Sequence, residues 1–130
     1  QRYANPVEEL EFVKREARVQ DTKNRQNSIE VDDRTFQTDW EREQGRVIWM
    51  CKQVYQQAIK KGIAKEVARA VLPEGLIKSR MYMNGTIRSW IHFIELRSAN
   101  GTQKECMQVA RACGEAISKI FPMVKEFYNE

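Results

Sequence analysis

The feature that most constrains the fold is a long helical pattern between Thr38 and Gly62. Thr38 and Glu41 have the spacing of a capping box, in which each side chain bonds the other residue's backbone amide, so the helix is expected to begin there. Gly62 predicts its end, because glycine readily adopts the left-handed conformation of a helix C-cap. Between them, apolar residues recur at the spacing of one buried helix face. They are Val47, Ile48, Cys51, Val54, Tyr55, Ala58 and Ile59.

Two shorter helices are predicted next. The first covers residues 64–71, with Val67, Ala68 and Val71 facing inward, and it ends before Pro73 because proline disfavours the helical conformation of the preceding residue. The second covers residues 86–97 and follows the turn signal of residues 84–85. Its apolar stripe consists of Ile87, Trp90, Ile91 and Ile94.

A last long helix is expected after the break at residues 100–101, where Thr102 and Glu105 repeat the capping-box spacing. Pro122 ends it, and one loose turn follows over residues 124–128. Its predicted buried face consists of Cys106, Val109, Ala110, Cys113, Ala116, Ile117 and Ile120.

Strand signals are fewer. We expect a short strand near residues 12–19, a loop at 21–28 and a second strand at 78–83, where apolar and polar residues alternate. The predicted fold class is therefore α+β, mainly helical with a small sheet, in a single domain covering residues 1–130.

Composition excludes several classes of protein. A hydrophobic share of 42% with 31% charged residues is typical of globular chains and not of disordered ones. Three cysteines, an odd number without C-x-x-C spacing, and one histidine predict neither a disulfide framework nor a metal site, and favour a reducing, cytoplasmic compartment. No apolar run is long enough to cross a membrane. The net charge of +4 suits an anionic ligand, but it equally suits a protein that is merely soluble.

The region from Glu66 to Glu105 is dense in charged residues for an ordinary core. It contains, in order, Glu66-Val67-Ala68-Arg69, Leu72-Pro73, Arg88-Ser89-Trp90-Ile91-His92-Phe93, Leu96-Arg97 and Gln103-Lys104-Glu105. Taken alone, Arg69 is more often a charge favoured by the helix dipole, and His92 a surface histidine, than either is a ligand contact. The residues by themselves support only a helical domain that binds an anion.

This region resembles the C-terminal half of the flavin-dependent thymidylate synthases (the ThyX family). There, an E-x-A-R-x-x-L-P segment is followed by a G-x-x-R-S-W-x-H-F-x-x-L-R helix and a Q-x-E helix start. The opening Gln1-Arg2-Tyr3 is similar to the end of the family signature R-H-R-x(7)-S-x-R. The R-H-R triplet and the signature serine do not occur in this chain, so the resemblance implies an N-terminally truncated subunit that is expected to bind FAD poorly or not at all by itself.

The resemblance implies the reductive methylation of deoxyuridine monophosphate (dUMP) to thymidylate. Methylenetetrahydrofolate is the carbon donor, reduced FAD carries the hydride, and NADPH is the reductant. It also implies a homotetramer whose active sites combine residues of several subunits, with no nucleic-acid or membrane partner and no metal. Relatives use no cysteine nucleophile, which agrees with three cysteines that the sequence assigns to the core.

The resemblance also implies roles for individual residues. Arg97 matches the arginine that binds and polarises the pyrimidine, and is the implied catalytic residue. Arg69 matches the phosphate-binding arginine, which Gln1 and Arg2 are expected to join at the nucleotide. Three positions match contacts to FAD, although many relatives have asparagine at the first of them. They are Thr86, Arg88 and His92.

Two other interpretations stay open. A basic helical module without catalytic activity could bind nucleic acid or a protein partner through Arg80, Arg88 and Arg97, with binding that falls steeply with salt. A purely structural fragment would bind neither nucleic acid nor nucleotide.

Overall fold

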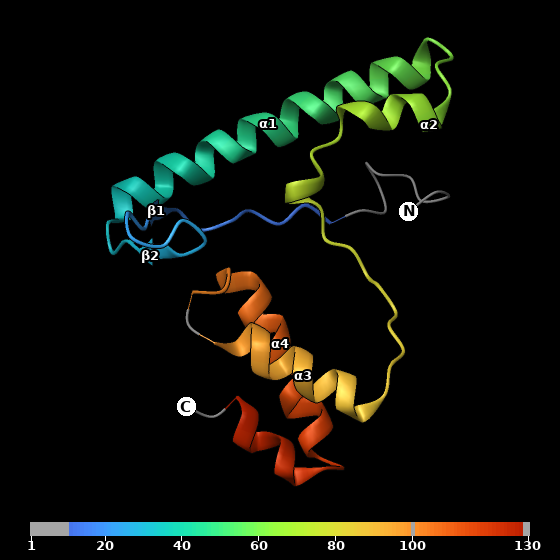
Figure 1. The fold of residues 1–130 in the computed structure, drawn as a ribbon. Coiled ribbons are helices and arrows are strands. Elements are labelled where there is room, and N and C mark those ends of the chain that lie inside the picture. The colour runs from blue at the N-terminus through green and yellow to red at the C-terminus, as the bar shows by residue number, and fades with distance from the viewer. Residues whose placement is uncertain (1–10, 100, 129–130) are drawn as a thin grey trace. The chain divides into compact units, whose positions relative to one another are not determined.

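The computed structural model describes residues 11–99 and 101–128 and is mainly helical with a small two-strand sheet, as predicted (Figure 1). Gln1 and Arg2 lie outside these residues. The elements, in order, are β1 (Arg18–Gln20), β2 (Ser28–Glu30), α1 (Arg34–Lys60), α2 (Lys65–Ala68), η1 (Arg69–Val71), η2 (Glu74–Leu76), α3 (Ile87–Ser98), α4 (Lys104–Ser118) and η3 (Pro122–Phe127).

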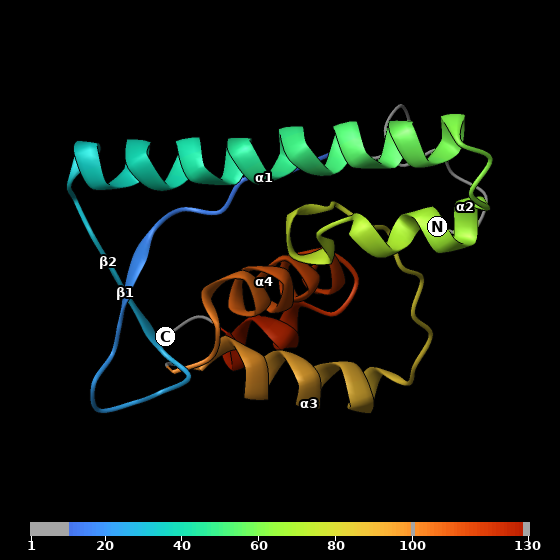
Figure 2. The same cartoon turned by 90° about the horizontal axis from the view of Figure 1, so that it is seen from above.

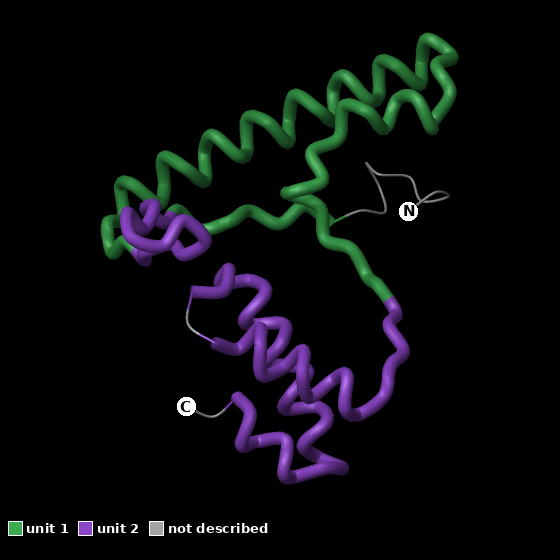
Figure 3. The backbone as a smooth tube through the Cα atoms, in the orientation of Figure 1, with its two compact units in different colours: residues 1–17, 31–81 green, residues 18–30, 82–130 purple. Residues whose placement is uncertain are grey.

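The chain forms two compact units (Figure 3). Unit 1 contains residues 1–17 and 31–81, and unit 2 contains residues 18–30 and 82–130. The β1–β2 hairpin thus belongs to unit 2, although the segments on either side of it belong to unit 1.

Helix α1 begins earlier than the capping box at Thr38 predicted. Asp33 is the N-cap, and its carboxylate accepts hydrogen bonds from the amides of Thr35 (3.0 Å) and Phe36 (3.2 Å). Thr38 lies inside the helix, where its hydroxyl donates to the carbonyl of Arg34. The prediction was wrong because a carboxylate that satisfies two first-turn amides already caps the helix one turn upstream.

The end of α1 was predicted correctly. Gly62 has φ of +83°, and two hydrogen bonds of a Schellman motif close the helix. The amide of Ile63 donates to the carbonyl of Ala58, and the amide of Gly62 donates to the carbonyl of Ile59, both at 3.0 Å.

In unit 1, two glutamines of α1 hold the extended segment that precedes β1. The carboxamide of Gln44 accepts from the amide of Arg15 (2.7 Å) and donates to its carbonyl (2.8 Å). Gln37 makes the same pair of bonds with Ala17, at 2.8 and 2.7 Å. These side chains take the place of a neighbouring strand, which is why Gln44 is buried at a position where an apolar residue would be expected.

The predicted buried face of α1 is only partly correct. Cys51 and Tyr55 are buried, but Val47 and Val54 are exposed, because the helix packs on the side that carries the two glutamines. Val47, Val54, Met50 and other residues line an open apolar hollow of about 980 Å³. In the next segment Ala68 is buried as expected, whereas Val67 and Val71 are exposed.

The chain between α1 and α3 follows the prediction at its start and departs from it later. The predicted helix 64–71 is present as α2 and η1, and it ends before Pro73. No strand forms over residues 78–83, because no neighbouring strand among the described residues pairs with them. The nearest pairing is an isolated bridge between Ile77 and Phe12. Tyr82 is 88% exposed. Alternation alone therefore misled the prediction.

The predicted strand at residues 12–19 is also shorter in the structure. Phe12 makes only the isolated bridge, and the regular strand β1 pairs antiparallel with β2, with Val19 opposite Ile29. Strand β2 starts at Ser28, which was assigned to the loop. The rest of that loop was predicted correctly.

Unit 2 is built from the hairpin and from α3, α4 and η3; Figure 2 shows α3 and α4 from above. Ile94 of α3, Ala110 of α4 and Val124 of η3 are fully buried. Gly114 lies on the buried side of α4, where an added Cβ would be 2.5 Å from Cδ1 of Tyr128. η3 and Tyr128 therefore cover a strip of small side chains on α4.

The buried face of α4 differs from the predicted one. Ala110, Gly114 and Ser118 form the buried strip, whereas Val109 and Ile120 are 58% and 76% exposed. Close packing by η3 favours small residues at the contact, so the most apolar stripe is not the one that is buried.

Candidate functional site

Arg97 lies in the last turn of α3 beside a polar hollow of about 360 Å³. We call this the Arg97 hollow. All of its lining residues belong to unit 2, and they are Gln26, Arg97, Thr102, Gln103 and Cys106. Its volume lies at the lower end of the range of about 300–1,000 Å³ seen for small-molecule sites. The hollow therefore suits a ring-sized ligand or part of a larger one.

The turn between α3 and α4 brings the end of one helix to the start of the next. α3 ends at Ser98, and the amide of Thr102 donates to the carbonyl of Ala99. Gly101 has φ of +88°, a conformation that favours glycine, and a Cβ there would also lie 2.6 Å from Nδ2 of Asn24. This glycine therefore allows both the tight turn and the close approach of the hairpin loop.

Two ion pairs attach the hairpin to the first turn of α4. Arg18 of β1 bonds Glu105 at 2.6 Å and the hydroxyl of Ser28 at 2.8 Å, and Lys104 pairs with Glu30 of β2. The side chains of Arg18 and Glu105 are only 12% and 23% exposed, so water screens this pair weakly. These contacts hold the hairpin loop, which contains Gln26, beside the Arg97 hollow.

The start of α4 differs from the predicted capping box. Gln103 is the N-cap instead of Thr102, and its side chain makes no capping hydrogen bond. Glu105, the expected reciprocal partner, is engaged with Arg18. The Gln103 carboxamide is therefore not used for capping, and it lies at the edge of the hollow. The positive end of the α4 dipole adds to the charge of Arg97 there.

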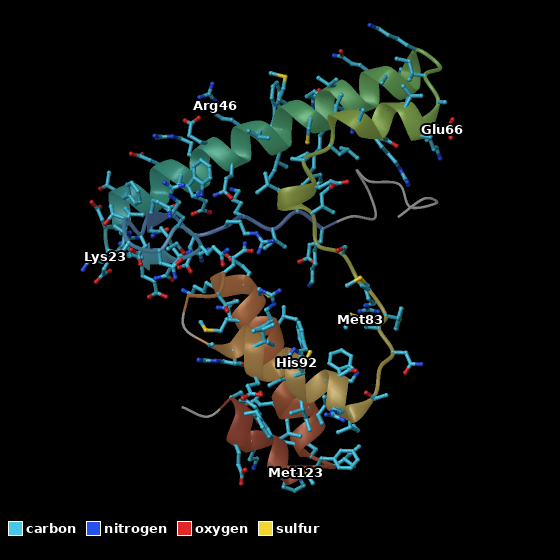
Figure 4. The ribbon with its side chains drawn as sticks, viewed as in Figure 1. Lys23, Arg46, Glu66, Met83, His92 and Met123 are labelled. Atoms are coloured by element: carbon cyan, nitrogen blue, oxygen red, sulfur yellow. The ribbon has the colours of Figure 1, made fainter. Side chains whose placement is uncertain are left out.

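The expected flavin contacts lie at the other end of α3, whose side chains are drawn in Figure 4 with His92 labelled. Thr86 is the N-cap, and its hydroxyl accepts from the amide of Ser89 (3.1 Å). Arg88 and His92 are exposed and one turn apart, so they share one side of the helix. Arg97 follows Arg88 by about two and a half turns and lies on the opposite side.

These residues fit the anionic part of a flavin dinucleotide. First-turn amides of a helix lack intrahelical acceptors, and with a guanidinium and an imidazole beside them they form a donor set suited to a diphosphate. Being exposed, Arg88 and His92 supply one wall of such a site.

The remaining predicted nucleotide residues are not brought to Arg97 within one unit. Arg69 is half-buried where α2 passes into η1, in unit 1, whereas Arg97 belongs to unit 2. The roles of Gln1 and Arg2 remain predictions, because those residues lie outside the described part of the chain.

None of the cysteines is in a disulfide. Burial raises the pKa of the Cys51 and Cys113 thiols, which favours the unreactive protonated form. Cys106 is half-buried in the wall of the Arg97 hollow. The described residues contain no group of three or more potential metal ligands, and none of their helices combines the length and apolarity of a membrane span.

Sequence reasoning did not include four lining residues of the hollow in the site. Gln103 could have been included, because it opens the Q-x-E segment of the resemblance, and Thr102 and Cys106 are its near neighbours. Gln26 has no local signal, since only the folded hairpin brings it to Arg97.

Comparison with known proteins agrees with the motifs. A family model described as thymidylate synthase complementing protein matches residues 1–123. A probable flavin-dependent thymidylate synthase of Paramecium bursaria Chlorella virus 1 is 46% identical over 124 residues, which cover 95% of this chain and 56% of the relative. The flavin-dependent thymidylate synthase of Synechocystis sp. is 43% identical over 109 residues, which cover 84% of this chain and 50% of that protein.

The chain thus spans about half the length of the curated relatives it matches. Because the family model covers nearly all of its residues and the matched motifs include Arg97 and Gln103 of the hollow, the chain belongs to the flavin-dependent thymidylate synthase family.

Proposed function

We propose that this chain takes part in the reductive methylation of dUMP to thymidylate, with methylenetetrahydrofolate as carbon donor, FAD as hydride carrier and NADPH as reductant. The observation that carries the proposal is the Arg97 hollow, because it joins two residues of the family motifs in one small polar cavity. The same site can be tested with dUMP alone.

In this proposal Arg97 binds the pyrimidine and polarises it. A fixed guanidinium beside the ring carbonyls stabilises the negative charge that develops there when the ring is attacked. Burial raises the pKa of the Cys51 and Cys113 thiols, which disfavours both as thiolate nucleophiles. In this proposal, electrostatic activation by Arg97 requires no covalent adduct with Cys106, the cysteine that lines the hollow.

Arg69, Gln1 and Arg2 bind the nucleotide phosphate in this proposal. Guanidinium groups suit that role because their planar fork makes paired, charge-assisted hydrogen bonds to phosphate oxygens. Arg69 and Arg97 belong to different compact units, which is compatible with a homotetramer whose sites combine residues of several subunits.

The flavin would be held by the start of α3. Arg88, His92 and the amides of the first helical turn bind its diphosphate, while Thr86 keeps that turn in place through its bond to Ser89. When bound, FAD supplies the hydride that reduces the transferred carbon. The role of these side chains is to bind and orient it.

The test is isothermal titration of the chain with dUMP, with and without FAD. Arg97→Ala is expected to weaken binding about 10- to 150-fold, the effect of losing hydrogen bonds from a charged group worth about 1.5–3 kcal/mol. The matched control is Arg34→Ala, which removes the same charge from an exposed position in the first turn of α1. Arg97→Lys separates charge from geometry, since lysine keeps the charge but lacks the fork.

Equal dUMP affinities for Arg97→Ala and Arg34→Ala would contradict the proposed role of Arg97. If the parent chain binds no dUMP, the titration is repeated on a fusion that adds the part of the Chlorella virus relative outside the match. A fusion that also fails to bind dUMP would refute the proposed function.

A further inference from the structure

We propose that Gln26 is a pyrimidine-binding residue of the nucleotide site: its carboxamide bonds the edge of the ring that carries N3 and O4, beside Arg97. This inference rests on the proposed function of the Arg97 hollow. It starts from the finding that Gln26, Arg97 and Gln103 line the same small cavity, although Gln26 is far from the other two in sequence.

The hairpin loop that carries Gln26 is held by its own polar side chains. The carboxylate of Asp21 accepts from the amides of Lys23 (2.8 Å) and Asn24 (3.2 Å). The side-chain oxygen of Asn24 accepts in turn from the amide of Gln26, at 3.1 Å. The loop backbone is thus fixed up to the residue that lines the hollow.

The Gln26 carboxamide differs from that of Gln20, the last residue of β1. Gln20 donates to the carbonyls of Asp21, Arg25 and Asn27. Among the described residues, the structure contains no hydrogen bond from the carboxamide of Gln26 or Gln103 to another protein group. Both glutamines can therefore bond a ligand in the hollow.

Pyrimidine chemistry gives such a carboxamide a specific role. Uracil presents an N3–H donor between two carbonyl acceptors, whereas cytosine has an acceptor at N3 and an amino donor at C4. Arg97 has only donors, so it can bond the carbonyls but cannot accept from N3–H. A glutamine carboxamide has an oxygen that accepts and a nitrogen that donates, which matches N3–H and O4 together.

A phosphate group in the hollow would use this set of residues differently. Phosphate oxygens only accept, so they would engage Arg97 and the start of α4, and the two carboxamide oxygens would have no donor to accept from. The presence of two carboxamides beside one guanidinium therefore favours the planar pyrimidine edge over phosphate.

The test compares Gln26→Ala and Gln26→Glu with the parent chain by isothermal titration. The probes are dUMP, deoxycytidine monophosphate (dCMP), N3-methyl-dUMP and deoxyribose 5-phosphate. Gln108→Ala is the matched control, since Gln108 is an exposed glutamine of α4 in the same unit. Far-UV circular dichroism checks that each variant keeps the parent's helix content.

Gln26→Ala is expected to weaken dUMP binding about 3- to 10-fold, the effect of losing one or two uncharged hydrogen bonds. Binding of deoxyribose 5-phosphate should not change, and binding of N3-methyl-dUMP should change less than that of dUMP, because the methyl group removes N3–H but leaves O4. Gln26→Glu should weaken the binding of dUMP and of dCMP to a similar extent. A carboxylate accepts from uracil N3–H but repels O4, and it accepts from the cytosine amino group but repels N3. A merely structural role for Gln26 would weaken the binding of N3-methyl-dUMP as much as that of dUMP.

Three results would overturn the inference. If Gln26→Ala binds dUMP like Gln108→Ala while Arg97→Ala loses it, the pyrimidine-binding role of Gln26 is wrong and the proposed function stands. If Gln26→Ala weakens deoxyribose 5-phosphate as much as dUMP, the hollow is a phosphate site. If neither the parent chain nor the fusion with the relative binds dUMP, the proposed function fails, and this inference fails with it.

Discussion

The close approach of Gly114 and Tyr128 gives a prediction about Gly114→Ala. This substitution should destabilise the protein when Tyr128 is present and stabilise it when Tyr128 is replaced by alanine. Gly114 lies inside α4, where glycine is about 1 kcal/mol less favourable than alanine. An alanine Cβ at this position would lie 2.5 Å from Cδ1 and 2.6 Å from Cε1 of the Tyr128 ring. Gly114→Ala therefore has two opposing effects on stability. The higher helix propensity of alanine stabilises α4, and the steric overlap with the aromatic ring destabilises the fold.

The overlap should outweigh the gain. Overpacking of a close contact costs about 1–3 kcal/mol, so Gly114→Ala is expected to lower the free energy of unfolding by up to about 2 kcal/mol. In a Tyr128→Ala background the obstruction is absent, and the same substitution should raise the free energy of unfolding by about 0.5–1 kcal/mol. The coupling energy between the two sites is then about 1–3 kcal/mol.

The assay is equilibrium unfolding in urea of the four proteins of this double-mutant cycle. Trp90 lies in unit 2, whereas Trp40 and Trp49 lie on α1 in unit 1 and are 47% and 61% exposed. Replacing the two exposed tryptophans by phenylalanine in all four proteins makes the fluorescence of Trp90 report on unit 2 alone.

A matched control is Gly45→Ala in α1, measured through the fluorescence of Trp40 and Trp49 in a background in which Trp90 is replaced by phenylalanine. Its Cβ would meet only the flexible end of Lys14, with Nζ at 3.4 Å, so it should stabilise unit 1 by about 1 kcal/mol. Equal effects of Gly114→Ala with and without Tyr128 would show that the ring does not restrict this position, and the packing explanation would be wrong.

Two local features of the chain give further predictions. Asp33→Ala should lower the free energy of unfolding by about 1 kcal/mol because it removes the N-cap of α1. Thr38→Ala should not lower it, because Thr38 is exposed inside the helix, where alanine has the higher helix propensity. Urea unfolding followed by circular dichroism compares the two variants, and a larger loss for Thr38→Ala would support the capping box as the helix start. The hydrogen bond from Asn27, followed by those from two loop amides, lowers the pKa of Asp21, so its contribution to stability is present at neutral pH and is lost as the pH falls through this lowered value. An NMR titration of the Asp21 carboxyl should therefore give a pKa below about 3.9, the ordinary value for aspartate, and an ordinary pKa would argue against the loop hydrogen bonds.

Several parts of the fold could be predicted from sequence because their causes are local. The Schellman end of α1 needs only Gly62 and the carbonyls of the preceding turn. The cap of α3 needs only Thr86 and the amide of Ser89, and the end of the short helix before Pro73 follows from the proline ring itself. Each cause and its effect lie within a few residues of each other.

The helix faces and the strands could not be predicted in the same way. Apolar spacing on α1 and α4 indicated a face, but Val47 and Val109 are exposed, because the segment that packs on each helix selects the side that is buried. On α1 that segment is bound by Gln37 and Gln44, and polar residues give no signal in a hydrophobic pattern. The expected strand at residues 78–83 fails for a similar reason, since a strand requires a partner that the alternating pattern does not specify.

The candidate site shows the same division. The order and spacing of residues 66–105 determined the family, because such motifs are local in the sequence, and they predicted a role for Arg97. Only the tertiary structure decided that Gln26 lies beside Arg97, because that neighbourhood depends on the ion pair between Arg18 and Glu105 and on the turn at Gly101. Contacts between residues distant in sequence depend on the free energy of the whole fold, so a local sequence pattern does not predict them.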